Sequence, residues 1–428
     1  LPALNTVHTM HGSINNNDQL MIATAPEQKL AWVAETQFYV PEGPSIDQQG
    51  HLYFSPFRPN EDVSLVALDG ETGERRWTLP ANGDTNGSGA TLILNSPEHQ
   101  QEIIYHSTYH TIWAVTTDGN ILWTQPTGLR WQDENTISPH AWGVNFIPRL
   151  NALSVVTGNG KIALFDRLSG DALLAQPFDL PGSPAVSNYD ARPAEIIRNW
   201  ADDAAAEQFG NANADEGLFT TITGIIFGGG REVTNFYASD PISNRLYVAA
   251  TSLDENDGKR DNISELGALY ALDIVADKGG KYKLDIAARY DFDGGTGSTP
   301  SVTNDGQKVF TSDEHGNLIA ISRDMKEVWR VNVGEQIIAS PAIGSDNGEI
   351  YVISQYNILK IQDNGMTGEL AWKANIDVFP GFKSINALTP TITANGVAVS
   401  IGAVKSIGNA DLMMGVGFTL VLVVIGAI

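Results

Sequence analysis

The sequence contains no cysteine, and this absence excludes three kinds of chemistry. Disulfide bonds, thiolate catalysis and cysteine-based zinc sites all need a thiol that the chain does not have. Exported proteins often avoid stray thiols, and the chain begins at Leu1 with neither an initiator methionine nor a signal peptide. We therefore expect a processed protein of the periplasm or the extracellular space.

Basic residues are few: 26 Lys and Arg stand against 50 Asp and Glu, and the formal net charge is −24 at pH 7. Nucleic acid is therefore not an expected partner, because phosphate binding needs a basic face. The acidity fits a soluble protein in salty or calcium-containing surroundings. The favoured interpretation is simpler: the acidic residues form an ordinary solvated surface.

Familiar catalytic signatures and long apolar runs are also scarce. The sequence has no Gly-x-Ser-x-Gly, no His-Glu-x-x-His and no phosphate-cradling loop. One uncharged apolar run covers residues 412–428. A membrane span needs ~20 such residues, and the β-branched content of this run favours a buried strand. Membrane association is expected only if this run is not a strand.

What the sequence does contain is a recurring hairpin. In the clearest copy, an apolar strand over 63–68 meets a polar turn and a second strand that ends at Trp77. Gly73 supplies the positive φ of the turn, and Asp69 and Thr72 can bond its backbone. We expect the tryptophan to pack against a neighbouring unit. Further copies lie at 23–32, 116–123, 165–174, 321–329 and 363–372, and another opens at 270–273.

Residues 67–77 carry the most specific signal, because they match the pattern A-x-D-x-x-T-G-x-x-x-W. This pattern resembles the PQQ-like (pyrroloquinoline-quinone-type) β-propeller repeat. The resemblance covers most of the chain except 188–230 and 409–428, and a hairpin repeated every roughly 40–50 residues agrees with it. It implies an all-β propeller fold. It does not distinguish a scaffold from an enzyme, because both kinds of protein contain the repeat.

A second motif, a small residue or proline followed by a short apolar stretch, marks where blades begin. Eight such starts accompany seven clear hairpin closures, so we favour eight blades, with seven as the alternative, in a single propeller domain over 1–428. The starts are at 43–46, 89–92, 138–139, 183–186, 236–239, 299–302, 340–343 and 389–392. Small residues there allow the inner strands to crowd at the axis.

Two features depart from the regular repeat. Residues 194–208 read as a helix, so we expect a helical excursion over 188–230 that covers one face as a lid. Residues 19–24 and 29–34 read as the last two strands of a blade that lacks its first strands. We expect the C-terminal segments at 390–393 and 397–400 to complete this blade and close the ring.

One stretch concentrates side chains capable of acid–base chemistry. His106, Tyr109, His110, Arg130 and His140 lie near predicted blade tops. A histidine or tyrosine there would act as general acid or base, and the arginine would neutralise a carboxylate. The alternative is that alternation along the strand turns several of these side chains into the sheet, where they serve as packing residues. For any single residue, this packing interpretation is favoured.

A calcium site and a quinone site are the two cofactor hypotheses. Asp254, Asn256, Asp261 and Glu265 have the spacing of a calcium loop, but Lys259 stands where that loop needs glycine, so an acidic surface loop is favoured. In the quinone enzymes of the family, one blade ends in Gly-Thr-Gly-Asn and its asparagine helps to hold calcium. Here 249–252 reads Ala-Ala-Thr-Ser, while Thr-Gly-Asn occurs at 157–159 in another blade. PQQ is therefore disfavoured and calcium remains open.

The leading functional hypothesis is an exported PQQ-like propeller that acts as a binding scaffold for a protein partner or a small-molecule or carbohydrate ligand. The competing hypothesis is an enzyme that works in the axial cleft under the lid. It would be a degenerate quinoprotein dehydrogenase, or a lyase or hydrolase on an acidic or hydroxylated carbohydrate. Convergence of the candidate residues in one pocket would favour the enzyme.

Overall fold

The computed structural model describes 18 stretches of the chain. They are residues 7–24, 30–35, 40, 42–56, 62–82, 88–130, 141–180, 233, 235–252, 266–293, 298–313, 315–335, 337, 339–345, 347–354, 357–376, 383–404 and 421–426. Apart from two short 3₁₀ turns at Pro148–Leu150 and Lys278–Gly280, the regular structure in these stretches is β-strand. The all-β prediction is therefore confirmed for the part of the chain that the structure describes.

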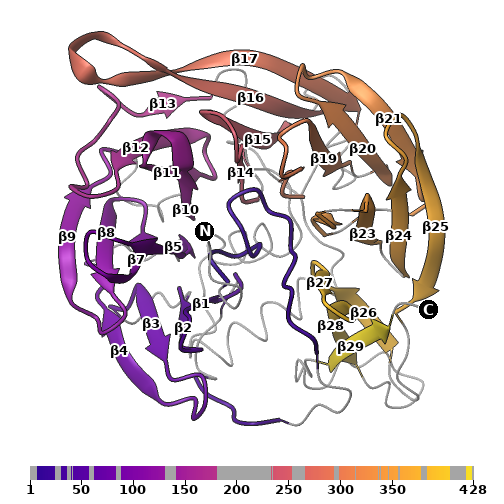
Figure 1. The fold of residues 1–428 in the computed structure, drawn as a ribbon, viewed down its shortest axis with the longest axis horizontal. Coiled ribbons are helices and arrows are strands. Elements are labelled where there is room, and N and C mark those ends of the chain that lie inside the picture. The colour runs from indigo at the N-terminus through magenta and orange to yellow at the C-terminus, as the bar shows by residue number, and fades with distance from the viewer. Residues whose placement is uncertain are drawn as a thin grey trace, which may run out of the picture.

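The described strands form seven sheets that stand around a common centre as the blades of a propeller (Figure 1). In six of them, consecutive strands pair antiparallel from the inside outwards. Sheet 1 holds β1 (Ser45–Ile46), β2 (Leu52–Phe54), β3 (Leu65–Leu68) and β4 (Arg75–Leu79). Sheet 2 holds β6 (Leu92–Ser96), β7 (Gln101–Ser107), β8 (Thr111–Thr116) and β9 (Ile121–Pro126).

The next three sheets continue in chain order. Sheet 3 holds β10 (Ala141–Ile147), β11 (Ala152–Thr157), β12 (Lys161–Asp166) and β13 (Phe178–Asp179). Sheet 4 holds β14 (Ala238–Ser239), β15 (Arg245–Ser252), β16 (Leu266–Ala276) and β17 (Tyr282–Asp293). Sheet 5 holds β18 (Ser301–Val302), β19 (Lys308–Ser312), β20 (Asn317–Ser322) and β21 (Glu327–Asn332).

Two sheets remain, and the last one has a different order. Sheet 6 holds β22 (Ala342–Ile343), β23 (Glu349–Ile353), β24 (Asn357–Asp363) and β25 (Gly368–Asn375). Sheet 7 holds β26 (Lys383–Ala387), β27 (Thr391–Thr393), β28 (Gly396–Val404) and β29 (Val421–Gly426). There β28 pairs with β27 and β26, and with β29 as well. The C-terminal apolar run thus contributes a strand, as its composition predicts.

Sheet 3 gains a fifth strand, β5 (Ser88–Ala90), which lies parallel to β10. Two glycines permit this approach. A Cβ on Gly89 would lie 2.0 Å from the carbonyl carbon of Trp142, and one on Gly143 would lie 2.3 Å from the Ala90 oxygen. Gly143 also has a φ of 114°, which side chains rarely adopt. The chain therefore passes from sheet 1 to the inner edge of sheet 3 before it returns to build sheet 2.

Neighbouring sheets pack on one another through apolar side chains, and strands such as β3 and β11 are buried along their whole length. Tyr53 of sheet 1 and Trp113 of sheet 2 share one cluster, and Val302 of sheet 5 joins Tyr247 of sheet 4 in another. Five further clusters fill the interior, so that each described sheet contacts the next along the chain. Burial is complete at these four side chains except for a trace at Trp113.

Four hairpin tryptophans dock on the hairpin turn of the following blade, as the repeat predicts. The ring of Trp77 lies against Gly119, where an added Cβ would be 2.9 Å from it, and its Nε1 donates to the Thr117 carbonyl at 3.0 Å. Trp32 docks in the same way on Gly73. Trp123 contacts Gly170, and Trp329 contacts Gly368.

Seven sheets are formed by the described residues. Sheets 3 and 4 pack directly on each other, because the Tyr237 hydroxyl donates to the Ser154 carbonyl at 2.6 Å and accepts from the Asn145 N–H at 3.1 Å. No additional sheet separates them, so the described residues match the seven-blade alternative. The predicted helix at 194–208, the lid at 188–230 and the blade start at 183–186 lie outside the described residues.

The prediction for the N-terminal residues is partly wrong. Residues 20–24 and 30–35 form no strand. They do meet the C-terminal sheet: Gln19 forms a parallel bridge with Ile392 of β27, and the side chain of Asn395 bonds the backbone of Thr24 at both its N–H and its carbonyl. The two ends of the chain therefore meet at the inner edge of sheet 7 rather than at its outer strands.

Candidate functional site

The centre of the propeller is occupied by the protein's own N-terminal segment. Residues 7–20, which we call the axial segment, run through the middle of the ring (Figure 1). Val7 pairs with Ile46 of β1 through two backbone hydrogen bonds, at 3.1 and 3.0 Å. At its other end, the Leu20 N–H donates to the Ile392 carbonyl at 2.8 Å. This segment lies where the sequence alone predicts an axial cleft.

A buried polar network holds the middle of the axial segment. The Nδ1 of His11 lies 2.8 Å from the Asp18 carboxylate, and its Nε2 lies 3.1 Å from the Thr299 hydroxyl. The exposed fractions are 4%, 6% and 0% for His11, Asp18 and Thr299. Burial raises the pKa of Asp18, while the neighbouring His11 opposes that shift. The order hydroxyl–imidazole–carboxylate resembles a nucleophile–base pair, but the hydroxyl has no access to solvent.

His106, one of the predicted catalytic residues, is a packing residue. It lies on β7 with no exposed surface, and its ring stacks on Trp113 at a centroid distance of 5.3 Å. Its Nδ1 is 3.5 Å from the Ser55 hydroxyl, and its Nε2 has no hydrogen-bond partner among the described residues. Burial lowers the pKa of His106 to about 3. The imidazole is therefore neutral at physiological pH and sealed from substrate.

Tyr109, His110 and Arg130 form a second group, separate from His106. The Tyr109 hydroxyl donates to the Arg130 carbonyl at 3.4 Å and accepts from the Asn159 amide at 3.2 Å. Tyr109 is buried, whereas His110 and Arg130 are exposed, and the His110 ring meets Tyr109 edge-on at 5.0 Å. These three residues do lie together, but the arginine is held through its backbone. His140 lies outside the described residues.

Asn159 belongs to the Thr-Gly-Asn sequence that resembles a quinoprotein motif. Its Oδ1 accepts a hydrogen bond from Thr157 at 2.6 Å, and its Nδ2 bonds Tyr109. Its amide is thus engaged within the protein. The segment that replaces the quinoprotein calcium motif lies in β15, where Ala249 and Ala250 are 4% and 5% exposed and pack in core clusters. Methyl groups offer calcium no ligand, so this blade does not fit a quinone–calcium site.

The predicted calcium loop, with Asp254, Asn256, Asp261 and Glu265, lies outside the described residues. Within the described residues, no group of three or more acidic or histidine side chains is arranged to hold a metal ion.

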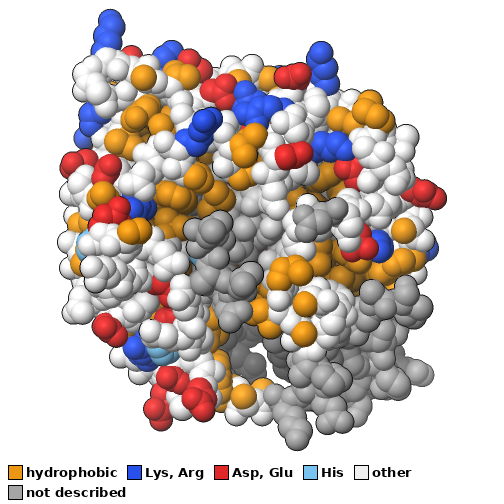
Figure 2. All heavy atoms as spheres, in the orientation of Figure 1, with side chains coloured by type: hydrophobic (Ala, Val, Ile, Leu, Met, Phe, Trp, Pro, Cys, Tyr) orange, Lys and Arg blue, Asp and Glu red, His pale blue; other side chains and the backbone are white. Residues whose placement is uncertain are grey.

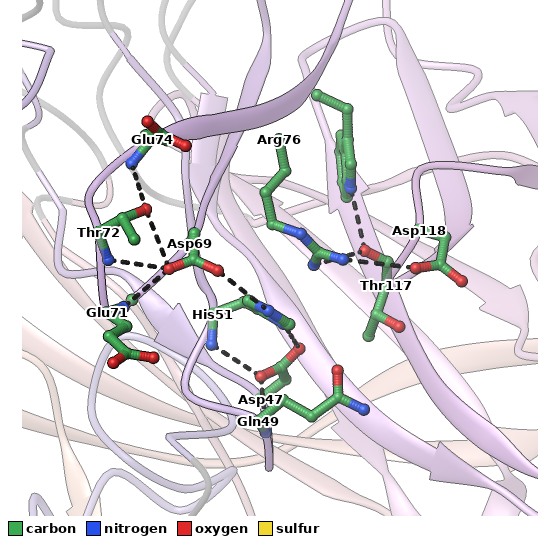
Figure 3. Close-up of polar contacts among 12 residues, drawn as sticks. Asp47, Gln49, His51, Asp69, Glu71, Thr72, Glu74, Arg76, Thr117 and Asp118 are labelled. Atoms are coloured by element: carbon green, nitrogen blue, oxygen red, sulfur yellow. Dashed lines mark hydrogen bonds and ion pairs between the residues drawn. The ribbon is translucent and has the colours of Figure 1, made fainter.

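The hairpin turns use their acidic residues for structure, as Figure 3 shows for the first blade. The Asp69 carboxylate accepts from the backbone N–H groups of Glu71 and Thr72 at 3.0 and 2.9 Å, and from the Thr72 hydroxyl at 3.1 Å. These bonds, led by the Thr72 N–H, lower the pKa of Asp69. The predicted roles of Asp69, Thr72 and Gly73, whose φ is 75°, are confirmed.

His51 is a neighbour that the sequence did not single out. Its Nδ1 lies 2.9 Å from the buried Asp47 carboxylate, and its Nε2 lies 3.8 Å from Asp69 (Figure 3). Asp47 also accepts from the Tyr53 hydroxyl at 2.8 Å and from two backbone N–H groups. Since these donors saturate its carboxylate, Asp47 stabilises the β1–β2 turn and is not available for catalysis.

Comparison with known proteins agrees with the repeat pattern. A family model described as outer membrane protein assembly factor BamB matches residues 18–196. The match covers less than half of the chain, and the described sheets have the arrangement of a β-propeller. No curated protein sequence matches it. The crystal structure of BamB from Moraxella catarrhalis is 13% identical and aligns over 83% of this chain and 80% of that one, with a TM-score of 0.46.

A europium-containing methanol dehydrogenase is also similar to this chain. It is 12% identical, aligns over 94% of this chain and 84% of that one, and has a TM-score of 0.51. At this identity the likeness shows the fold alone. Among the described residues, no helix has both the length and the apolar character that crossing a membrane requires.

Proposed function

We propose that this PQQ-like propeller is an exported scaffold that binds a protein partner. The observation that carries the proposal is the occupied axis. The axial segment fills the position in which an enzyme of this architecture would hold its substrate, and His106 is packed away from it. The family model that matches residues 18–196 is described as an assembly factor, and the absence of cysteine fits an oxidising compartment.

The partner is expected to dock on the segment that crosses from sheet 7 to sheet 1. Several apolar side chains of this crossing segment, residues 21–24 and 30–35, face solvent: Met21 is 61% exposed, Leu30 82% and Val33 67%. Trp32, between the last two, is anchored on the β3–β4 turn through its Nε1, which donates to the Gly70 carbonyl at 3.0 Å. Gathered apolar side chains on a soluble protein typically mark an interaction site.

The chemistry of the partner follows from charge. Acidic and basic side chains intermingle on the face shown in Figure 2, but the chain as a whole carries −24. A protein with an apolar contact surface and a basic rim complements the crossing segment and the field of the whole molecule. We therefore propose a basic protein partner rather than a carbohydrate.

Site-specific photocrosslinking in the producing cells tests this proposal. A photoreactive amino acid at position 30 is expected to capture one discrete partner, and Val33→Asp in the same chain is expected to abolish capture without lowering Tm. The same probe at the turn residue Lys326 is the control and should capture nothing. Equal capture at both positions, or capture that Val33→Asp leaves unchanged, contradicts the proposal.

The enzyme alternative has one supporting observation, the exposed His110 and Arg130 beside Tyr109 and Asn159. Titration of the full chain with PQQ and calcium tests the quinoprotein form of this alternative. No change in Tm or in the quinone spectrum would dismiss it, whereas saturable changes that His110→Gln and Arg130→Gln remove would support it.

A further inference from the structure

The axial segment contacts the sheets in the order in which they stand around the ring. All of these contacts are hydrogen bonds between backbone groups. The His8 carbonyl accepts from the Ile93 N–H of sheet 2 at 2.8 Å. The Ile14 carbonyl accepts from the Ser239 N–H of sheet 4, and the Asn15 carbonyl from the Val302 N–H of sheet 5, both at 2.9 Å. Contacts to Ile46, Ile343 and Ile392 serve sheets 1, 6 and 7. One short segment thus makes a full circuit of the described sheets.

The donors occupy equivalent positions, because each is on the innermost strand of its sheet. Four belong to the blade-start motif, in which a proline and a small residue precede the donor: Ile46, Val302, Ile343 and Ile392. Sheet 3 uses a side chain instead, and the Asn145 amide donates to the Ile14 carbonyl at 2.9 Å. An inner strand has a free edge on its axial side. The ring therefore presents a set of converging hydrogen-bond donors to any chain in the axis.

Side chains add selectivity to these backbone bonds. The Asn15 amide donates to the Val302 carbonyl at 2.6 Å and to Asn304 at 3.1 Å, and the Asn16 amide donates to the Pro300 carbonyl at 3.0 Å. Both asparagines are buried, at 4% and 0% exposure, and His11 reaches Thr299 of the same region. An apolar or bulky residue at these positions would leave buried carbonyl groups without donors.

We infer that the propeller axis is a peptide-binding site and that residues 7–20 are its built-in ligand. The ligand class is a short irregular peptide that offers successive carbonyl oxygens to the inner strands and carboxamide side chains to the 300–304 region. All described contacts of the segment are non-covalent, and its C-terminal end continues into the body through the crossing segment. The inference does not depend on the proposed partner, which would dock elsewhere.

The site predicts that the axial segment stays bound, and exchanges, after its covalent connection is cut. A protease recognition sequence replacing residues 25–29 in the full chain allows cleavage after folding. The N-terminal fragment is expected to co-elute with the body on gel filtration. A labelled synthetic peptide of residues 1–24 is expected to replace it and to raise the Tm of the fragment-depleted body in a saturable manner.

Matched variants distinguish recognition from simple trapping. Asn15→Ala with Asn16→Ala removes the three hydrogen bonds that the two amides donate and the one that Asn15 accepts from the Ser13 hydroxyl. It is expected to release the fragment roughly tenfold faster or more. Met21→Ser, at a residue that is 61% exposed, should release it at the parent rate. Immediate loss of the fragment with no rebinding of the peptide overturns the inference, and so does equal release by the two variants. Neither result bears on photocrosslinking at position 30.

Discussion

Burial at a single residue, His106, should control part of the response of this protein to acid. The folded state holds the pKa of His106 at about 3, whereas the unfolded chain titrates near the ordinary value of about 6.5. Between these values, only the unfolded state binds the proton. The free energy of unfolding therefore falls as the pH drops through about 6.5.

We expect His106→Phe to reduce this acid sensitivity. Phenylalanine keeps a ring against Trp113 and has no proton to bind, so the variant should lack the loss of about 2 kcal/mol that the histidine causes at pH 5. The measurement is Tm at pH 7 and pH 5. His110→Phe, at an exposed site, is the control and should follow the parent chain. A decline in Tm between the two pH values that His106→Phe does not reduce would contradict the assignment.

Single residues were the least predictable part of the site. The sequence marked His106, Tyr109 and Arg130 by type and proximity, but these do not fix their environments. His106 lies on β7 and is buried, whereas His110 lies in the turn between β7 and β8 and is exposed. Turn residues were more predictable, since Asp69, Thr72 and Gly73 interact within a few positions of one another and their geometry is local.

Individual hairpins are joined by tryptophan–glycine contacts, and a pair of glycines can separate the two reasons for that choice. Gly73 and Gly365 both have positive φ, at 75° and 89°. A Cβ on Gly73 would lie 2.6 Å from the ring of Trp32, whereas a Cβ on Gly365 meets no atom within 4 Å. Alanine at Gly365 therefore costs backbone strain alone, and alanine at Gly73 also displaces the tryptophan of the neighbouring hairpin.

We expect Gly365→Ala to destabilise the protein by about 1–2 kcal/mol and Gly73→Ala by a further ~1–3 kcal/mol from overpacking. Thermal or urea unfolding of the two variants measures the difference. Trp32→Ala combined with Gly73→Ala should remove the extra cost relative to Trp32→Ala alone. Equal effects of the two glycine substitutions would show that the tryptophan contact adds nothing.

At this scale the repeat pattern predicts well, because a hairpin encodes its own turn and, in four cases, the tryptophan that packs on the next turn. The segments that fail the pattern are those whose partners are distant in sequence. Residues 19–24 have the apolar composition of a strand, but their neighbours are β27 and the β27–β28 turn, more than 360 positions away. The composition of residues 19–24 does not indicate which edge of sheet 7 is left for them to contact.

For the whole molecule, the sequence predicts a ring but not what fills it. The blade-start motif indicated strands that crowd at an axis, and the structure adds that the same residues bind the axial segment. Nothing in residues 7–20 has strand or helix periodicity, because the segment follows a circle of donors rather than a single sheet. Its asparagines and histidines are typical of loops, and their burial arises only when seven sheets are assembled around them.

The net charge of −24 is also a property of the whole molecule, and it predicts how salt affects stability. Like charges repel most in the compact state, and raising NaCl from about 10 mM to about 1 M shortens the screening length from about 30 Å to about 3 Å. Exposed ion pairs such as Lys283–Asp285 lose little, since each contributes only about 0–1 kcal/mol. We therefore expect Tm to rise with NaCl at pH 7.

The rise should shrink at pH 5, closer to the isoelectric point of 4.5, because fewer net charges remain to be screened. A Tm that falls with salt at pH 7 would instead mean that ion pairs between blades outweigh the repulsion.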